Sequence, residues 1–168
     1  MFCAGTLIGT DRGDVAVQDL QPGTLVATRD AGWQPILAIR AVHVSAAMLR
    51  KDPDLQPVIL PTGFQGANAA LSVSPTQRIM LRGAQAQLLF GSAEILVAAQ
   101  LLAGAGAVRC QTINRSVVYY HLLLANHEVM QVHGVWTETL FLGDIALRAQ
   151  LPAAVAGSGG RQPAHAMP

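Results

Sequence analysis

The chain has 168 residues, of which 51% are hydrophobic and 12% are charged, and its formal net charge is +1. This length suits one domain, and so little charge excludes a disordered acidic or basic protein. Lysine and arginine are not clustered along the sequence, so we expect no nucleic-acid partner. The most apolar stretch, residues 92–108, is interrupted by Glu94 and Gln100, and it predicts no membrane span. The first residues lack the features of a signal peptide, and the sequence leaves the cellular location open.

Short apolar segments separated by turn residues about every 8 to 12 positions predict an all-β domain. In chain order, we expect strands at residues 6–9, 15–17, 24–28, 34–40, 57–60, 71–73, 79–81, 94–97, 108–113 and 116–124. A hairpin follows, in which residues 128–132 and 135–139 flank a reversal at His133-Gly134. Short helical turns are expected at residues 46–50 and 98–103.

The domain is expected to span residues 1–150. Residues 151–168 are small and rich in proline and glycine, with no apolar pattern that would anchor them to a core. We therefore predict a disordered C-terminal tail at 151–168, and His165 carries no functional weight.

Three histidines recur at regular spacing in the late part of the chain: His121, His127 and His133. On one unbroken strand they would share a face, and Cys110 would offer a fourth ligand for zinc. Residues 125–126 interrupt that strand, however, and His133 falls in the predicted turn. Histidines satisfied within a sheet are thus the favoured interpretation, and we predict neither a metal nor a cofactor.

Cys3 is the candidate nucleophile that residue types alone indicate. A cysteine and a histidine far apart in sequence can meet in a fold, where the imidazole lowers the pKa of the thiol. Free cysteines are commonly inert, buried side chains, and this is the role we expect for Cys110. Residue types therefore make Cys3 a weak candidate.

Three blocks of the sequence carry a family resemblance. The first is MFCAGTLIGTDRGDVAVQDLQPGTLVATRDAGWQPI, which is similar to a start of the form Cys-Phe-x-x-Gly-Thr followed by Asp-Leu-x-x-Gly-Asp. The second, LSVSPTQRIML, resembles a Ser-Pro-x-His-Arg block, and the third, VVYYHLLLANHEVMQVHGVWTETLF, resembles a Tyr-x-His-Leu…His-Glu-Val…Gly…Glu-Ser-Phe block. The three blocks resemble those of the Hint (hedgehog/intein) domain, specifically its bacterial intein-like branch, and together they cover residues 1–143.

The resemblance implies a fold and an activity. The fold would be an all-β, flattened disc or horseshoe of long curled strands with one or two short helical turns, in which the chain start meets residues 121–139. In this family an N-terminal cysteine attacks the carbonyl of the preceding residue, so that an N-to-S acyl shift converts a peptide bond into a thioester. A Thr/Ser-x-x-His block holds and protonates the scissile amide, and a later histidine assists. The implied activity is single-turnover self-cleavage or protein splicing, with an upstream polypeptide in cis as partner.

The first block departs from the family pattern at the nucleophile. When Phe2 and Gly5-Thr6 are aligned with the family, Met1 takes the place of the cysteine, and a thioether has no proton to lose. Cys3 lies two residues further along, which shifts its sulfur by about 6.6 Å on a strand. Reacting atoms must approach within about 3–3.5 Å, so Cys3 is no direct replacement.

The other two blocks depart as well. Ser74 opens the second block, but Gln77 stands where the family has histidine, and an amide has no titratable proton near neutral pH. In the third block His127 matches the assisting histidine, and His121 stands where many inteins carry a catalytic aspartate. No His-Asn pair follows before the tail, so splicing through asparagine cyclisation is not supported.

We therefore predict a degenerate Hint domain that has lost most or all autoprocessing and persists as a binding or structural module. Its vestigial or candidate catalytic residues are Met1, Cys3, Ser74, Gln77, His121 and His127. One alternative is an active self-cleaving domain that uses Cys3 or an upstream cysteine, with Gln77 as a weak amide orienter and His127 as base. The other is a small-ligand or metal-binding β domain.

Overall fold

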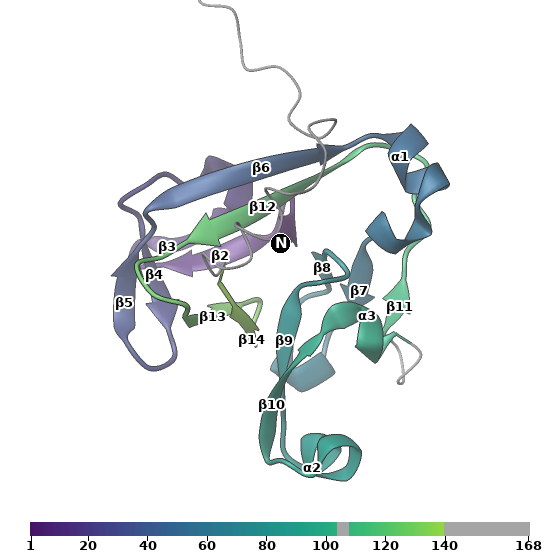
Figure 1. The fold of residues 1–168 in the computed structure, drawn as a ribbon. Coiled ribbons are helices and arrows are strands. Elements are labelled where there is room, and N and C mark those ends of the chain that lie inside the picture. The colour runs from purple at the N-terminus through teal and green to yellow at the C-terminus, as the bar shows by residue number, and fades with distance from the viewer. Residues whose placement is uncertain (104–107, 140–168) are drawn as a thin grey trace, which may run out of the picture.

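The computed structural model describes residues 1–103 and 108–139, with the side chain of Gln85 excepted. This part of the chain forms two antiparallel β-sheets with a few short helices, which confirms the predicted all-β class (Figure 1). The predicted domain end at residue 150 and the predicted tail at 151–168 lie outside the described residues. None of the helices in the described ranges is long and apolar enough to cross a membrane.

The first sheet has six strands within the described residues. Their order is β11 (Arg109–Cys110), β7 (Val58–Leu60), β8 (Leu71–Val73), β1 (Phe2–Cys3), β12 (Val117–Leu123) and β6 (Ala38–Val44). β6 and β12 pair over their whole length, from Val44 opposite Val117 to Ala38 opposite Leu123. At seven residues each, these two are the longest described strands, so most strands are shorter than the long curled strands we expected.

The second sheet has eight strands in the same part of the chain. The order is β10 (Glu94–Ala98), β9 (Arg78–Arg82), β14 (Val135–Glu138), β13 (Val129–Val132), β2 (Leu7–Thr10), β4 (Leu25–Thr28) and β5 (Gly32–Pro35), and β3 (Gly13–Ala16) pairs with β2. The predicted strand at residues 34–40 is in fact two strands, β5 and β6. Between them the N–H of Ile36 bonds Thr24, whereas the N–H of Leu37 bonds Leu123. The chain therefore passes from one sheet to the other at this point.

β1 is a central strand although it has only two residues. Phe2 lies opposite both Tyr120 of β12 and Val73 of β8. Side chains alternate along a strand, so Phe2 enters the main core while Cys3 faces a second, smaller apolar cluster with Tyr119. The start of the chain is thereby held between a mid-chain and a late segment.

The predicted hairpin at the end of the described chain is confirmed. β13 and β14 are joined by a two-residue turn, in which His133 has φ 49° and Gly134 has φ 83°. Positive φ at both positions is the geometry of the tight hairpin turns that match strand twist. The turn packs against another loop, because a Cβ built on Gly134 would lie 2.6 Å from the carbonyl oxygen of Gly66.

Three α-helices are present in the described residues, rather than the one or two helical turns we expected. The predicted turns at 46–50 and 98–103 correspond to α1 (Ala46–Lys51) and α3 (Ala99–Leu102). The helix we did not predict, α2 (Ala84–Phe90), begins after Gly83 without a side-chain cap and ends at the left-handed Gly91. Since it has no polar N-cap, the sequence signal for its start is missing. Three short 3-10 segments complete the elements: η1 (Val17–Asp19), η2 (Pro53–Leu55) and η3 (Phe64–Gly66).

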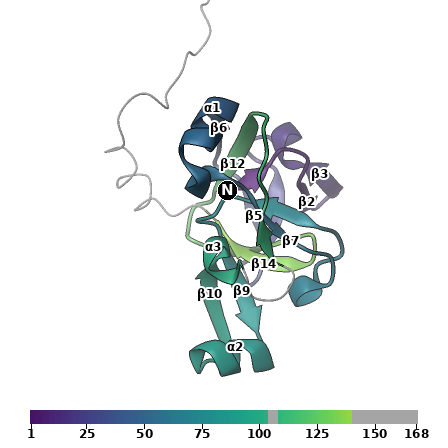
Figure 2. The same ribbon diagram turned by 90° about the vertical axis from the view of Figure 1, so that its right-hand side faces the viewer.

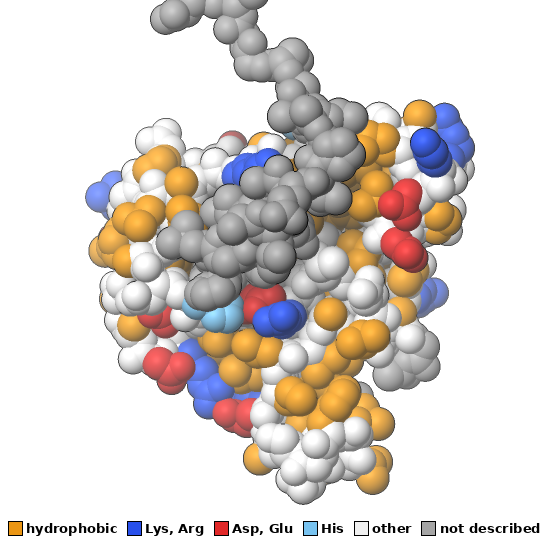
Figure 3. Space-filling view, viewed as in Figure 1, with side chains coloured by type: hydrophobic (Ala, Val, Ile, Leu, Met, Phe, Trp, Pro, Cys, Tyr) orange, Lys and Arg blue, Asp and Glu red, His pale blue; other side chains and the backbone are white. Residues whose placement is uncertain are grey.

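The β9–β10 hairpin and α2 project from the rest of the molecule in both views (Figures 1 and 2). In the space-filling view, apolar side chains gather on this projecting end (Figure 3). They belong in part to α2, where Leu88 is 85% exposed and Leu89 and Phe90 are also exposed.

Candidate functional site

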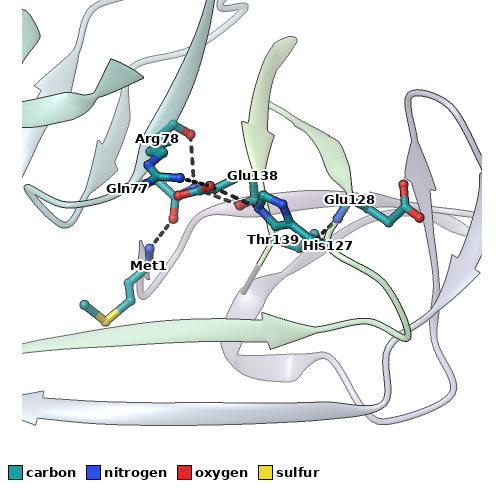
Figure 4. Close-up of polar contacts among 7 residues, drawn as sticks. All are labelled: Met1, Gln77, Arg78, His127, Glu128, Glu138 and Thr139. Carbon is teal, nitrogen blue, oxygen red and sulfur yellow. Dashed lines mark hydrogen bonds and ion pairs between the residues drawn. The ribbon is translucent and has the colours of Figure 1, made fainter. Parts of the chain in front are cut away.

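The N-terminus, the turn before β9 and the end of β14 converge on one site (Figure 4). Residues 74–77 form a β-turn closed by the N–H of Gln77 on the carbonyl of Ser74 at 3.0 Å, with Pro75 at the position that proline prefers. This turn receives the chain start, because the N–H of Ser74 bonds the carbonyl of Met1 at 2.9 Å. The α-amino group of Met1 in turn donates to Oε1 of Gln77.

The side-chain amide of Gln77 is buried, and its orientation follows from its neighbours. Its Nε2 donates to the carbonyl of Glu138 at 2.8 Å and reaches the carbonyl of Arg78 at 3.3 Å. Two carbonyl oxygens accept only from the NH2 end of the amide, so the oxygen end faces the nitrogen of Met1. Gln77 therefore accepts a hydrogen bond from the first residue and does not donate one to it.

The carboxylate of Glu138 lies between two basic side chains. Its Oε2 is 3.1 Å from Nε2 of His127 and 3.4 Å from a guanidinium nitrogen of Arg78. The Glu138 side chain is only 10% exposed, whereas those of His127 and Arg78 are 32% and 53% exposed. The nearly buried carboxylate thus has two partners that both reach it from partly exposed positions.

His127 lies in the loop between β12 and β13, and a pair of hydrogen bonds fixes this loop to the end of β14. The N–H of Glu128 donates to Oγ1 of Thr139 at 2.9 Å, and the N–H of Thr139 donates to the carbonyl of Glu128 at 2.8 Å. As a result, the residue that follows His127 is held beside the residue that follows Glu138.

Ser74 brings a buried hydroxyl to the site. The residue is 1% exposed, and within the described residues its Oγ has no hydrogen-bond partner. A buried polar group without a partner costs about 1–3 kcal/mol, so such groups in native proteins require an explanation. Here the hydroxyl belongs to the residue that holds the carbonyl of Met1.

Cys3 lies in the smaller apolar cluster with Val44, Leu49 and Tyr119. Burial raises the pKa of its thiol to about 11, and the positive N-terminus offsets part of this effect. The thiol is therefore protonated near neutral pH, which is the opposite of what a nucleophilic cysteine needs. Cys110 is exposed on β11, so the expectation of a buried core thiol is wrong at that position. In the described residues β11 is an edge strand of the first sheet and pairs with β7 alone.

The other histidines occupy separate elements. His121 lies within β12, opposite Arg40 of β6. His133 lies in the hairpin turn, where its Nε2 accepts a hydrogen bond from the N–H of Leu7 at 3.0 Å. Across residues 1–103 and 108–139, no three His, Cys, Asp or Glu side chains come close enough to hold a metal ion.

The two charged partners Arg78 and Glu138 were not predicted as residues of the site. Both fall inside the blocks that carry the family resemblance, one beside Gln77 and the other after the hairpin. Their opposite charges were a possible signal for a pair. Only the pairing of β9 with β14, where Thr137 lies opposite Ile79, brings the two side chains together.

Comparisons with known proteins identify the family. A model of the Hint domain matches residues 1–144. The chain belongs to the Hint domain family. A search of the curated proteins finds no match.

Three solved structures share the fold of this Hint domain. The bacterial intein-like domain from Clostridium thermocellum is 13% identical with a TM-score of 0.53, over 83% of this chain and 97% of that one. A splice-inactive variant of the AceL NrdHF class 3 split intein is 13% identical with a TM-score of 0.53, over 82% and 95%. The MchDnaB-1 intein is 11% identical with a TM-score of 0.51, over 83% and 100%. At these identities the likeness concerns the fold, and it confirms the predicted Hint architecture.

Proposed function

We propose that this Hint domain has lost most or all autoprocessing activity and persists as a binding or structural module. The observation that carries the proposal is the orientation of the Gln77 amide. Its oxygen accepts from the nitrogen of residue 1, and its NH2 group is occupied by the carbonyls of Glu138 and Arg78.

The chemistry of an N-to-S acyl shift explains why this orientation matters. The nitrogen of residue 1 is the leaving group of the scissile bond, and it must gain a proton to depart. An imidazolium at position 77 has two N–H donors, so it could bond the carbonyl of Glu138 and still donate to that nitrogen. A glutamine amide has donors at one end only. Gln77 therefore accepts a hydrogen bond from the nitrogen of residue 1 and has no proton to donate to it.

The sulfur atoms near the chain start support the same proposal. Met1, at the position of the family's nucleophile, has a thioether that cannot be deprotonated. Cys3 is buried in an apolar cluster and its thiol pKa is raised, so it is poorly suited to attack a carbonyl. No contact in the described residues favours the alternative of self-cleavage through Cys3.

The remaining contacts suit a structural or binding role. Gln77 links the chain start to β14, and the N–H of Ser74 bonds the carbonyl of Met1. The former reaction centre thereby holds β1 in its place in the sheet. A polypeptide upstream of Met1 would join the domain at the nitrogen of Met1, where these contacts hold the chain. We therefore propose such a segment in cis as the partner of the module.

The test fuses a reporter protein before Met1 and follows its release on a gel, with and without dithiothreitol. We expect no release from the native sequence, none from Met1→Cys or Gln77→His alone, and thiol-dependent release from the double variant. A Met1→Ser, Gln77→His variant is the matched control. Serine at position 1 would form an oxygen ester, which does not exchange with dithiothreitol as a thioester does.

Prompt release from the native sequence would contradict the proposal. In that case Cys3→Ala would decide whether Cys3 is the nucleophile. Release that needs neither substitution but stops with Cys3→Ala would establish the active alternative.

A further inference from the structure

We propose that Glu138 is a positioning residue, whose carboxylate fixes the ring of His127 with its proton on Nε2 and its lone pair on Nδ1. The family resemblance gave no role to this residue. The inference does not depend on whether autoprocessing is lost, because it concerns the state of His127 in the native chain.

The first step is the donor–acceptor balance between the two side chains. An ionised carboxylate can only accept hydrogen bonds, so the ring nitrogen 3.1 Å from Oε2 of Glu138 must carry a proton. A neutral imidazole has one N–H, and Nδ1 then carries the lone pair. Any proton that His127 accepts from another group must therefore arrive at Nδ1.

The second step is that the carboxylate cannot easily turn away from the ring. A guanidinium nitrogen of Arg78 lies 3.4 Å from the same oxygen, so two donors hold it in place. The Glu138 side chain is also nearly buried, so water competes poorly for it.

The third step is the backbone on either side. Glu138 lies opposite Val129 in the hairpin, and the Glu128–Thr139 hydrogen bonds fix the chain just after His127. The carbonyl of Glu138 also accepts from Gln77. One residue therefore sets the ring of His127 through its side chain and the amide of Gln77 through its backbone (Figure 4).

A second histidine supplies an internal reference. Nε2 of His133 accepts from the N–H of Leu7, so the neutral ring of His133 must carry its proton on Nδ1. The two histidines are thus expected to hold opposite tautomers in the same molecule.

The experiment is long-range proton–nitrogen NMR on the full, nitrogen-15-labelled chain, at a pH where the ring signals have stopped titrating. We expect His127 to show a protonated Nε2 with a slowly exchanging N–H, and His133 to show a protonated Nδ1. In Glu138→Leu, the His127 N–H should exchange about tenfold faster or become invisible, because its acceptor is gone. Glu138→Gln keeps an acceptor oxygen and should retain the N–H with weaker protection.

Glu128→Gln is the matched control, since its carboxylate points away from His127 in Figure 4 and the substitution should leave the His127 signals unchanged. The His133 signals report whether each variant is folded, and if Glu138→Leu is unfolded the Gln variant decides. A native His127 with its proton on Nδ1 would overturn the proposal. So would a protected Nε2–H that survives unchanged in folded Glu138→Leu. Either result leaves the reporter-release test of the proposed function unaffected.

Discussion

Cys3 shows how burial changes the chemistry of a single side chain. Two residues from the nitrogen where the family's reaction begins, it packs among apolar neighbours and opposite Tyr119. An apolar environment disfavours the thiolate, which raises the pKa of Cys3 from 9.0 to about 11. Burial and the nearby Cys3 raise the pKa of Tyr119 in the same direction. A cysteine near the start of a Hint domain is therefore no evidence of a nucleophile by itself.

This burial predicts a loss of stability at alkaline pH. Between about pH 9 and 11 the unfolded chain releases the Cys3 proton while the folded chain keeps it, so the unfolded state is favoured as pH rises. The free energy of unfolding should fall by up to about 2–3 kcal/mol over this range from Cys3 alone, with Tyr119 adding to the decline.

Urea titrations at successive pH values measure this slope. Cys3→Ala should flatten the slope, whereas Cys110→Ala, at an exposed thiol, should not change it. An equally steep decline in Cys3→Ala would show that the thiol is not responsible.

At the level of single elements, the β13–β14 turn requires glycine at position 134 for two reasons: its backbone angle and the space around it. Gly134 has φ 83°, and a Cβ there would also lie 2.6 Å from the backbone oxygen of Gly66, which cannot move aside like a side chain. Gly63 has a similar φ of 88° but open space around the position of its Cβ. Comparing substitutions at these two glycines separates the free-energy cost of the strained backbone angle from that of the steric clash.

Gly134→Ala should lower the free energy of unfolding by more than Gly63→Ala does. The strained backbone costs about 1–2 kcal/mol in both variants, and the clash adds about 1–3 kcal/mol at Gly134. Chemical denaturation of both variants measures the difference. Equal losses would mean that the loop containing Gly66 yields to the new methyl group.

Elements with local signals were predictable from the sequence. The hairpin turn is His-Gly between the two segments predicted as strands. The helix α1 has Ser45 as its N-cap, and residues 71–73 match β8 as predicted. The break between β5 and β6 was not predictable, because residues 36 and 37 bond to segments far apart in the sequence. Strand pairing across the fold, rather than propensity, decides where the chain changes sheets.

The same distinction applies to the site. Ser74, Gln77 and His127 were found through short motifs, each readable within one block of sequence. Glu138 depends on a contact between β14 and the loop before β13, and the orientation of the Gln77 amide depends on a carbonyl 61 residues away. Such facts exist only after the sheets have formed.

For the whole molecule, the decisive feature is that the chain start is a central strand. β1 lies between β8 and β12, so residues near both ends of the described chain and a mid-chain strand share one sheet. Phe2 is 2% exposed and packs in the main core. Without the first residues, no strand would link β8 to β12 in the first sheet.

Phe2→Ala should therefore destabilise the entire domain by about 3–5 kcal/mol, through lost burial and the cavity left behind. Trp33→Ala, at a side chain that is 51% exposed, is the control and should change the stability by about 0.5 kcal/mol or less. Thermal unfolding followed by both far- and near-ultraviolet circular dichroism tests this. A small effect of Phe2→Ala would indicate that β1 is dispensable to the sheet.

The projecting hairpin of β9 and β10 has a practical consequence for studying this protein. Leu88 on α2 is almost fully open to solvent, and none of the polar contacts described for Met1, Gln77 or Glu138 involves its helix. A fluorophore or spin label attached there would report on tumbling and assembly from outside. The contacts of Gln77 and Arg78 lie at the start of β9, at the end of that strand away from α2, and a label on α2 would leave them unchanged.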